Sequence, residues 1–212
     1  MFILQKLILH PFQKEGISKI KEMNSFLLGD EMGLGKTIQA LTVAIDRNTR
    51  ALIICPAFLK LNWLHEIESF TDKKAFVFGH HSLKDFNNKY FFYVINYDIL
   101  TKNTGIIKTL FLSFLIVDEA HYIKNPKSKR SKATILLSTL FKYKLLMTGT
   151  PVMSRPVELW NILFCLYPEK FASYWSYVYK YCDAFKEIYR YDRQGKPQYH
   201  LNVSGSSKLN EL

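Results

Sequence analysis

The sequence predicts an α/β fold organised around a doubly wound, mainly parallel β-sheet. Short apolar runs, typical of strands, alternate with stretches of helical spacing, as in consecutive βαβ units. The run at 51–56 is apolar throughout, as expected of a strand buried on both faces of a parallel sheet. Polar motifs follow three of the runs, at the strand ends where such sheets bind their ligands.

The N-terminal part predicts helix, strand and helix in turn. Pro11 suits the first turn of a helix, and the apolar residues that follow it have loosely helical spacing. The apolar run at 26–29 predicts a short buried strand. After a glycine-rich loop, Ile38, Leu41 and Ile45 share one face of a helix.

The middle of the chain predicts further strands separated by helices. Pro56 ends the second strand and Gly79 closes the third. Apolar stripes predict helices over 59–70, from about residue 96, within 133–141 and over 159–166. The strands after the first are expected at 51–56, 75–78, 91–95, 114–117 and 145–147.

Composition indicates the class of protein and of partner. The 212 residues suit one α/β domain, alone or with an appendage, and 48% hydrophobic with 22% charged residues is globular. A net charge of +11 favours a polyanion, nucleic acid first, although a merely soluble basic protein has the same charge. Three distant cysteines and no membrane-length or signal segment predict an intracellular protein without structural metal or membrane partner.

The segment between the first strand and its helix reads Asp30-Glu31-Met32-Gly33-Leu34-Gly35-Lys36-Thr37. Glycines let the backbone approach an anion, and the following helix start offers unpaired N–H groups. Lys36 can reach the β- and γ-phosphates of a nucleotide, and the Thr37 hydroxyl can ligate Mg²⁺. A strict P-loop has glycine where Asp30 stands. We expect ATP and Mg²⁺ as cofactors; the nucleotide-binding candidates here are Asp30, Gly33, Leu34, Gly35, Lys36 and Thr37.

A carboxylate pair follows the strand at 114–117. Asp118 would hold Mg²⁺, directly or through water, and Glu119 would orient and deprotonate the attacking water. An isolated Asp-Glu pair is commonly a solvated turn, but this pair follows four apolar residues in a chain with a phosphate loop. The catalytic candidates are therefore Lys36, Asp118 and Glu119.

Two stretches allow alternative interpretations. No acidic residue occurs from Ala120 through Val157, a span that holds eight lysines and arginines; they form either a solvated helix face or a phosphate-contacting surface. Residues 164–199 are dense in aromatics, which suit either base stacking or the core of a small helical subdomain. We favour the helical interpretation, with a lobe at 1–168 and a helical, aromatic-rich extension at 169–212.

The motifs resemble those of the switch/sucrose-nonfermenting ATPases, a group of superfamily II DNA translocases. The loop at 30–37 with Ile38-Gln39-Ala40-Leu41 resembles motif I, where Asp-Glu-Met-Gly is the normal form. His10-Pro11-Phe12-Gln13 resembles the Gln motif, which implies that Gln13 reads adenine. Further likenesses are Cys55-Pro56 with Asn62, Trp63 and Glu66 (motif Ia), Asn96-Tyr97 (Ib), Asp118-Glu119-Ala120-His121 with Ile123-Lys124-Asn125 (II) and Thr148-Gly149-Thr150-Pro151 (III).

This resemblance implies a RecA-like P-loop NTPase lobe that couples ATP hydrolysis to movement on DNA. Motif III in that family couples the ATP state to the grip on DNA. Together with the basic stretch, the resemblance implies DNA contacts at Lys124, Lys127, Lys129, Arg130, Thr148, Gly149 and Thr150.

A narrower likeness at 153–159, 181–184 and 205–212 is to the annealing-helicase, fork-remodelling branch, which implies duplex or forked DNA. The family's second RecA-like lobe, with its arginine finger, has no match here, so we expect that lobe in cis or in trans. Alternatives are a non-enzymatic half-motor that regulates a partner and an RNA helicase lobe. The expected location is the nucleus in a eukaryote and the cytoplasm in a prokaryote or virus.

Overall fold

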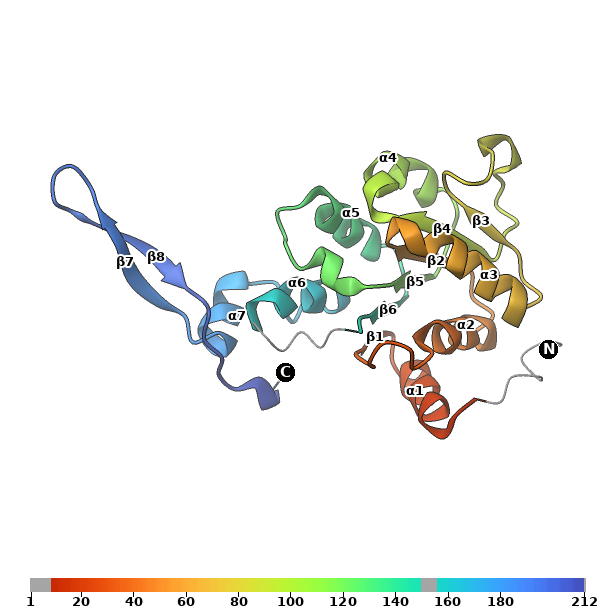
Figure 1. The fold of residues 1–212 in the computed structure, drawn as a ribbon, viewed down its shortest axis with the longest axis horizontal. Coiled ribbons are helices and arrows are strands. Elements are labelled where there is room, and N and C mark those ends of the chain that lie inside the picture. The colour runs from red at the N-terminus through yellow and green to blue at the C-terminus, as the bar shows by residue number, and fades with distance from the viewer. Residues whose placement is uncertain (1–8, 150–155, 212) are drawn as a thin grey trace.

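The computed structural model describes residues 9–149 and 156–211. Its centre is a six-stranded sheet in the order β1-β6-β5-β2-β4-β3 (Figure 1). Neighbouring strands pair in parallel throughout, which confirms the doubly wound sheet. The strands are β1 (Ser25–Leu28), β2 (Ala51–Cys55), β3 (Ala75–Val77), β4 (Phe92–Asn96), β5 (Phe114–Val117) and β6 (Tyr143–Met147).

Helices cover both faces of this sheet. Successive residues of a strand point to opposite faces, so each strand contributes side chains to two hydrophobic cores. Leu52 and Ile54 of β2 belong to one buried cluster, with residues of α4, α5 and α6. Ile53 and Cys55 belong to the other, with residues of α1, α2 and α3. The helices are α1 (Pro11–Glu22), α2 (Lys36–Asp46), α3 (Lys60–Phe70), α4 (Tyr97–Lys108), α5 (Lys129–Ser138), α6 (Pro156–Leu166) and α7 (Tyr174–Tyr181).

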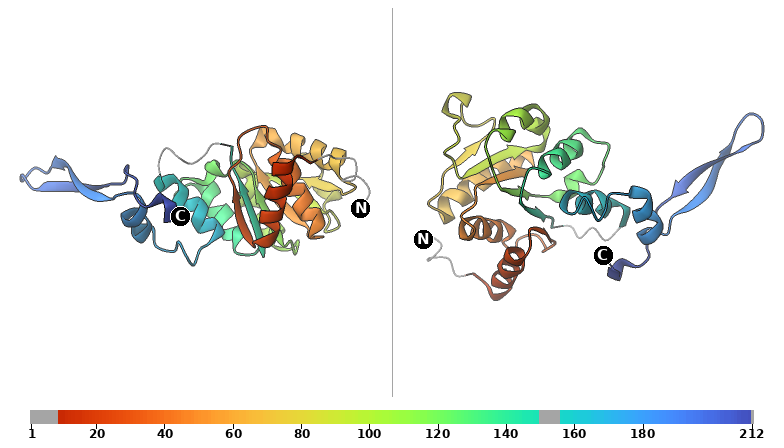
Figure 2. Two further views of the ribbon diagram at one scale, coloured as in Figure 1. Left: turned by 90° about the horizontal axis from the view of Figure 1, so that it is seen from below. Right: turned by 180° about the vertical axis from the view of Figure 1, so that it is seen from behind.

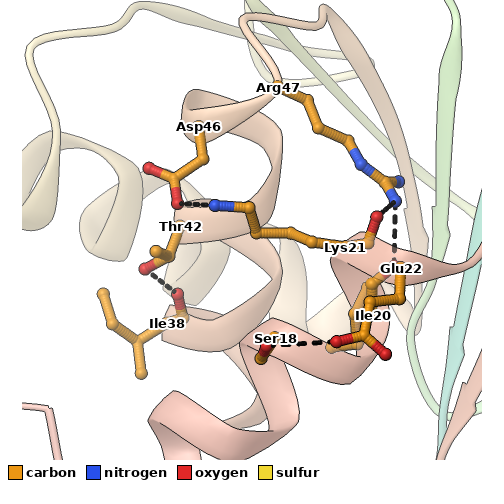
Figure 3. Close-up of polar contacts among 8 residues, drawn as sticks. All are labelled: Ser18, Ile20, Lys21, Glu22, Ile38, Thr42, Asp46 and Arg47. Carbon is orange, nitrogen blue, oxygen red and sulfur yellow. Dashed lines mark hydrogen bonds and ion pairs between the residues drawn. The ribbon is translucent and has the colours of Figure 1, made fainter.

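The C-terminal end of α1 is clamped to the C-terminal end of α2 (Figure 3). Lys21 forms an ion pair with Asp46 at 2.8 Å. Arg47 donates to the backbone carbonyls of Ile20 at 2.8 Å and Lys21 at 3.1 Å, among the last carbonyls of α1, which have no i+4 partner within the helix. The clamp orients α1 so that Gln13, near its other end, lies against the loop before α2.

The helical extension predicted at 169–212 is wrong beyond α7. An antiparallel hairpin follows, formed by β7 (Phe185–Tyr191) and β8 (Pro197–Asn202). Tyrosine and phenylalanine favour strands, and Gly195 in the connecting turn has a φ of +75°, which suits glycine. Phe171, Tyr177 and Tyr181 are buried in one cluster, as the sequence predicts, whereas the aromatics of the hairpin are exposed. The helix expected from Leu209 is a single 3₁₀ turn, Leu209–Glu211.

None of the helices within 9–149 and 156–211 has the length and apolar character needed to cross a bilayer.

Candidate nucleotide-binding site

The loop between β1 and α2 depends on glycine at two positions. Gly33 and Gly35 have φ values of +84° and +74°, in the left-handed region that favours glycine. A Cβ atom on Gly35 would also lie 2.4 Å from the Nε2 atom of Gln13. Lys36 folds over this loop, and its Nζ atom donates to the carbonyls of Asp30 and Glu31 at 2.8 Å each.

The side chain of Gln13 contacts the loop through a hydrogen bond. Its amide donates to the carbonyl of Leu34 at 3.2 Å and accepts from the backbone N–H of His10 at 3.0 Å. A glutamine amide carries two donors and two acceptor sites, so one of each is left over. One donor and one acceptor is the pair that a bidentate contact with adenine requires.

Asp118, at the end of β5, is almost fully buried and doubly hydrogen-bonded. Oδ2 accepts from the indole N–H of Trp63 at 2.9 Å, and Oδ1 accepts from the backbone N–H of Glu119 at 2.9 Å. The hydroxyl of Tyr97 donates to its backbone carbonyl at 2.7 Å. Burial raises the pKa of Asp118, and the Trp63 hydrogen bond partly opposes that rise. These contacts orient the carboxylate before any ligand arrives.

Glu119 has a strained backbone. Its φ of +49° and ψ of +55° are left-handed, which for a residue other than glycine costs on the order of 1–3 kcal/mol. Its Oε2 atom lies 3.1 Å from Nδ1 of His121, within ion-pair distance when the imidazole is protonated. Such strain commonly accompanies a functional position, because the fold must hold the side chain against it.

The loop and the carboxylate pair share one cavity of about 300 Å³. This juxtaposition is the convergence at strand ends that the sequence predicts. Asp30, Leu34 and Gln13 lie outside the lining; the Asp30 carboxylate instead accepts from Gln39 at 3.1 Å. The lining residues are Met32, Gly33, Gly35, Lys36, Thr37, Leu59, Asn62, Trp63, Glu66, Asp118 and Glu119.

The chemistry of this cavity fits Mg²⁺. Thr37 and Asp118 present oxygen ligands to one space beside Lys36, and Mg²⁺ prefers oxygen. In the described part of the chain no three histidine, cysteine or acidic side chains gather into a metal cage. An ion held by the two oxygens of Thr37 and Asp118 would take its remaining ligands from water and substrate phosphates.

Glu66 of α3 is an acidic lining residue to which the sequence analysis assigned no role. Burial, and then the nearby Asp118 carboxylate, raise the pKa of Glu66. Asn62, Trp63 and Glu66 belong to the segment that resembles motif Ia. That resemblance is the feature of the sequence that could have pointed to a role for Glu66. The approach of these three residues to Asp118 depends on how α3 packs on the sheet, where it contacts β3 and β4.

Motif III lies behind the phosphate loop. The side chain of Thr148 is 1% exposed, and a Cβ atom on Gly149 would lie 2.6 Å from Cγ of Met32. The buried Thr148 side chain offers no surface for the DNA contact predicted for it. Gly149 is half-buried, and the DNA contact predicted for it stays a prediction. Thr150, the third residue of that prediction, lies outside the described residues.

The basic residues after motif II lie on a second surface. Lys127, Lys129 and Arg130 are exposed, whereas Lys124 is already engaged with Glu158, 3.1 Å from both carboxylate oxygens. A cavity of about 470 Å³ opens where α4 and α5 begin. It is lined by Tyr97, Asp98, Thr101, Lys102, Ser128, Lys129 and Arg130.

Solved structures share this fold. The core of a Sulfolobus solfataricus SWI2/SNF2 ATPase, solved in complex with dsDNA, matches with a TM-score of 0.75 and 32% identity. The match covers 83% of this chain and 39% of that chain. The Sulfolobus solfataricus SWI2/SNF2 ATPase core domain matches with a TM-score of 0.72 and 33% identity.

Curated relatives match along nearly the whole sequence. The SWI/SNF-related matrix-associated actin-dependent regulator of chromatin subfamily A-like protein 1 of Xenopus tropicalis is 31% identical over 96% of this chain. The DNA annealing helicase and endonuclease ZRANB3 of Homo sapiens is 33% identical over 95% of it. The chain spans about a fifth of the length of these relatives, 21% and 19% respectively.

A family model, the SNF2-related domain, matches residues 13–210. This match spans the phosphate loop, the Asp118–Glu119 strand end and the hairpin, and it confirms the resemblance seen in the motifs. The chain therefore belongs to the SNF2-related domain family.

Proposed function

We propose that this chain is the ATP-binding lobe of an ATP-dependent double-stranded DNA translocase of the annealing-helicase type. The observation that carries the proposal is the single cavity shared by the Lys36 loop and the Asp118–Glu119 pair. The relatives add support, since one is named a DNA annealing helicase and one was solved in complex with dsDNA.

The residues of the cavity divide the work of phosphoryl transfer. Lys36 would exchange its two loop carbonyls for phosphate oxygens, and Gln13 would use its free donor and acceptor on adenine. Thr37 and Asp118 would hold Mg²⁺, which when bound neutralises developing phosphate charge. Glu119 would take a proton from the water that attacks the γ-phosphorus.

The cavity is one wall of a larger site. Within the described ranges no arginine lines it. An arginine that reaches the γ-phosphate is worth about 10³–10⁵ in rate where it has been measured. We propose that a second RecA-like lobe, in cis or in trans, supplies the opposite wall.

The cavity where α4 and α5 begin is the proposed contact with the DNA backbone. Two helix N-termini and the side chains of Lys102, Lys129 and Arg130 meet there, and both kinds of group bind phosphate. The Arg130 guanidinium lies 5.2 Å from the Tyr122 ring, which stacks on Tyr97. Because Tyr97 donates to the carbonyl of Asp118, these packed side chains connect the DNA surface with the nucleotide site.

Relatives that are named for chromatin and for DNA annealing support a location in the compartment that contains the cellular DNA. We propose that the protein acts in the nucleus if it is eukaryotic and in the cytoplasm if it is prokaryotic or viral.

Steady-state ATP hydrolysis tests the proposal. The chain alone should hydrolyse ATP near background, and a second SNF2 lobe added in cis should give turnover that duplex DNA stimulates. In that fusion Glu119→Gln should stop turnover while ATP binding persists, because an amide cannot accept the proton. Normal turnover by the Glu119→Gln fusion would remove Glu119 as the base.

The same assay separates the alternatives. A chain that binds DNA or nucleotide but stays inactive with a second lobe would be a regulatory half-motor. Stimulation by RNA in place of duplex DNA would identify an RNA helicase lobe.

A further inference from the structure

The β7–β8 hairpin extends away from the six-stranded sheet, beyond α7 (Figures 1 and 2). Every residue of β7 is exposed, although an uncovered two-stranded hairpin is at best marginally stable by itself. Its base is anchored, since Leu201 and Val203 pack against the cluster of α6 and α7. The backbone N–H of Ser207 also donates to the carbonyl of Tyr181 at 3.0 Å. The hairpin is therefore an arm that is anchored at its base and exposed to solvent at its far end.

The two faces of this arm differ in chemistry. The register pairs Ile188 with Tyr199 and Tyr191 with Pro197, and paired residues project from the same face. Ile188, Tyr199 and Tyr191 remain 45%, 55% and 64% exposed, so this apolar face has no cover. The opposite face is mixed: Glu187 accepts from Asn202 at 2.9 Å, and the exposed Tyr189 ring contacts His200 at 5.6 Å between ring centroids.

The arm carries positive charge that no ion pair compensates in the described part of the chain. The Asp192 carboxylate is occupied in the turn, where Oδ1 accepts from the backbone N–H groups of Gln194 and Lys196 at 2.9 Å. Glu187, the other acid of the hairpin, lies beside His200 at 3.6 Å. Within the described residues no ion pair engages the four cations of the arm, Lys186, Arg190, Arg193 and Lys196.

Exposed tyrosines beside cations that form no ion pair with the described residues suit a ligand that carries both negative charge and planar rings. Single-stranded nucleic acid has this chemistry, because aromatic side chains stack on bases while cations follow the backbone. A purely apolar protein surface would bury these cations without a partner, at a cost in desolvation. Charge complementarity thus favours the nucleic acid.

We propose that the apolar face of the β7–β8 hairpin binds unpaired nucleotides by stacking bases on Tyr191 and Tyr199. These tyrosines are diagonal neighbours on one face of the hairpin, on either side of the register shift between Ile188 and Arg190. Aromatic side chains at diagonal positions are within reach of each other, so one stretch of unpaired nucleotides can contact both rings. In the described part of the chain neither ring packs on another aromatic ring. The inference goes beyond the proposed function, since stacking requires neither ATP nor a second lobe.

Fluorescence anisotropy on the full chain tests the inference, with a labelled oligothymidylate and a blunt duplex as probes. Tyr191→Ala with Tyr199→Ala should weaken oligothymidylate binding at least fivefold per lost ring, roughly the lower bound for base stacking. Duplex affinity should stay unchanged. Tyr179→Ala is the matched control, because Tyr179 of α7 is 55% exposed, as Tyr199 is. Tyr→Phe changes at both hairpin positions should retain binding.

Several outcomes would overturn the inference once circular dichroism shows the variants folded. One is equal oligothymidylate affinity in the double alanine variant and the parent. Equal loss on both probes would indicate backbone contact without stacking. Sedimentation showing a dimer that the double variant abolishes, without oligothymidylate binding, would assign the face to a second copy. Lys36→Ala should leave oligothymidylate binding intact, so a failed ATP site cannot mimic these results.

Discussion

The indole N–H of Trp63 donates to Oδ2 of Asp118 at 2.9 Å, joining α3 to the end of β5 across 55 positions of sequence. Trp63 does not ligate the metal in our proposal; it orients a residue that does. This hydrogen bond favours the ionised carboxylate against the burial that opposes it. Trp63 is therefore a positioning residue.

Replacing Trp63 by phenylalanine removes that hydrogen bond and keeps an aromatic ring. We expect the Mg²⁺ concentration needed for tight ATP binding to rise about 10- to 100-fold, as for other partners of metal ligands. Calorimetric ATP titrations over a series of Mg²⁺ concentrations measure this. Trp175→Phe is the control, since Trp175 is 60% exposed on α7. The same Mg²⁺ dependence in both variants would contradict the positioning role.

Gly35→Ala should abolish ATP binding with only a modest loss of stability. The left-handed φ of +74° costs an L-residue roughly 1–2 kcal/mol, and the new methyl group would displace the amide of Gln13 from the loop. Gly105→Ala is the matched change inside α4, where a Cβ atom meets nothing within 4 Å. That variant should gain about 1 kcal/mol of stability and bind ATP normally. Equal ATP affinity in both variants would show that the loop tolerates a side chain.

Charge reversal at Lys127, Lys129 and Arg130 should weaken duplex binding about equally for unrelated sequences, because phosphate contacts carry no base information. The slope of log affinity against log salt should fall by about one unit per lost contact. Reversal at Lys74, Lys84 and Lys89, which are also exposed, provides the control. An unchanged slope would mean that the first three residues are only a solvated surface.

The buried cysteines predict how stability depends on alkaline pH. Burial raises the pKa of Cys165 from 9.0 to about 11, so the folded chain keeps the neutral thiol where the unfolded chain ionises. Unfolding then releases a proton between about pH 9 and pH 11, and the free energy of unfolding falls as pH rises through that window. The full two-unit difference corresponds to at most about 3 kcal/mol.

Urea denaturation at pH 8 and pH 11 measures this loss. The Cys165→Ala variant should lose less stability than the parent between the two values. An identical pH dependence in parent and variant would show that Cys165 does not contribute.

The sequence alone determined the sheet and the place of the site. Each strand of the sheet contains a short apolar run that can be recognised in the sequence without knowledge of the packing. The motifs directly follow three of these strands. Lys36, Asp118 and Glu119 could be brought together in advance because parallel strands end at one edge of a sheet.

Only the tertiary structure decided which side chains complete the site and where the C-terminal aromatics lie. Trp63 meets Asp118, and Gly149 packs behind Met32, through contacts between elements that no local periodicity encodes. Residues 185–202 are rich in side chains that suit either a buried helix or a strand, so composition left the choice open. The cross-strand register and the Asp192 turn favour the strands, because they satisfy the backbone within a hairpin that needs no helical core.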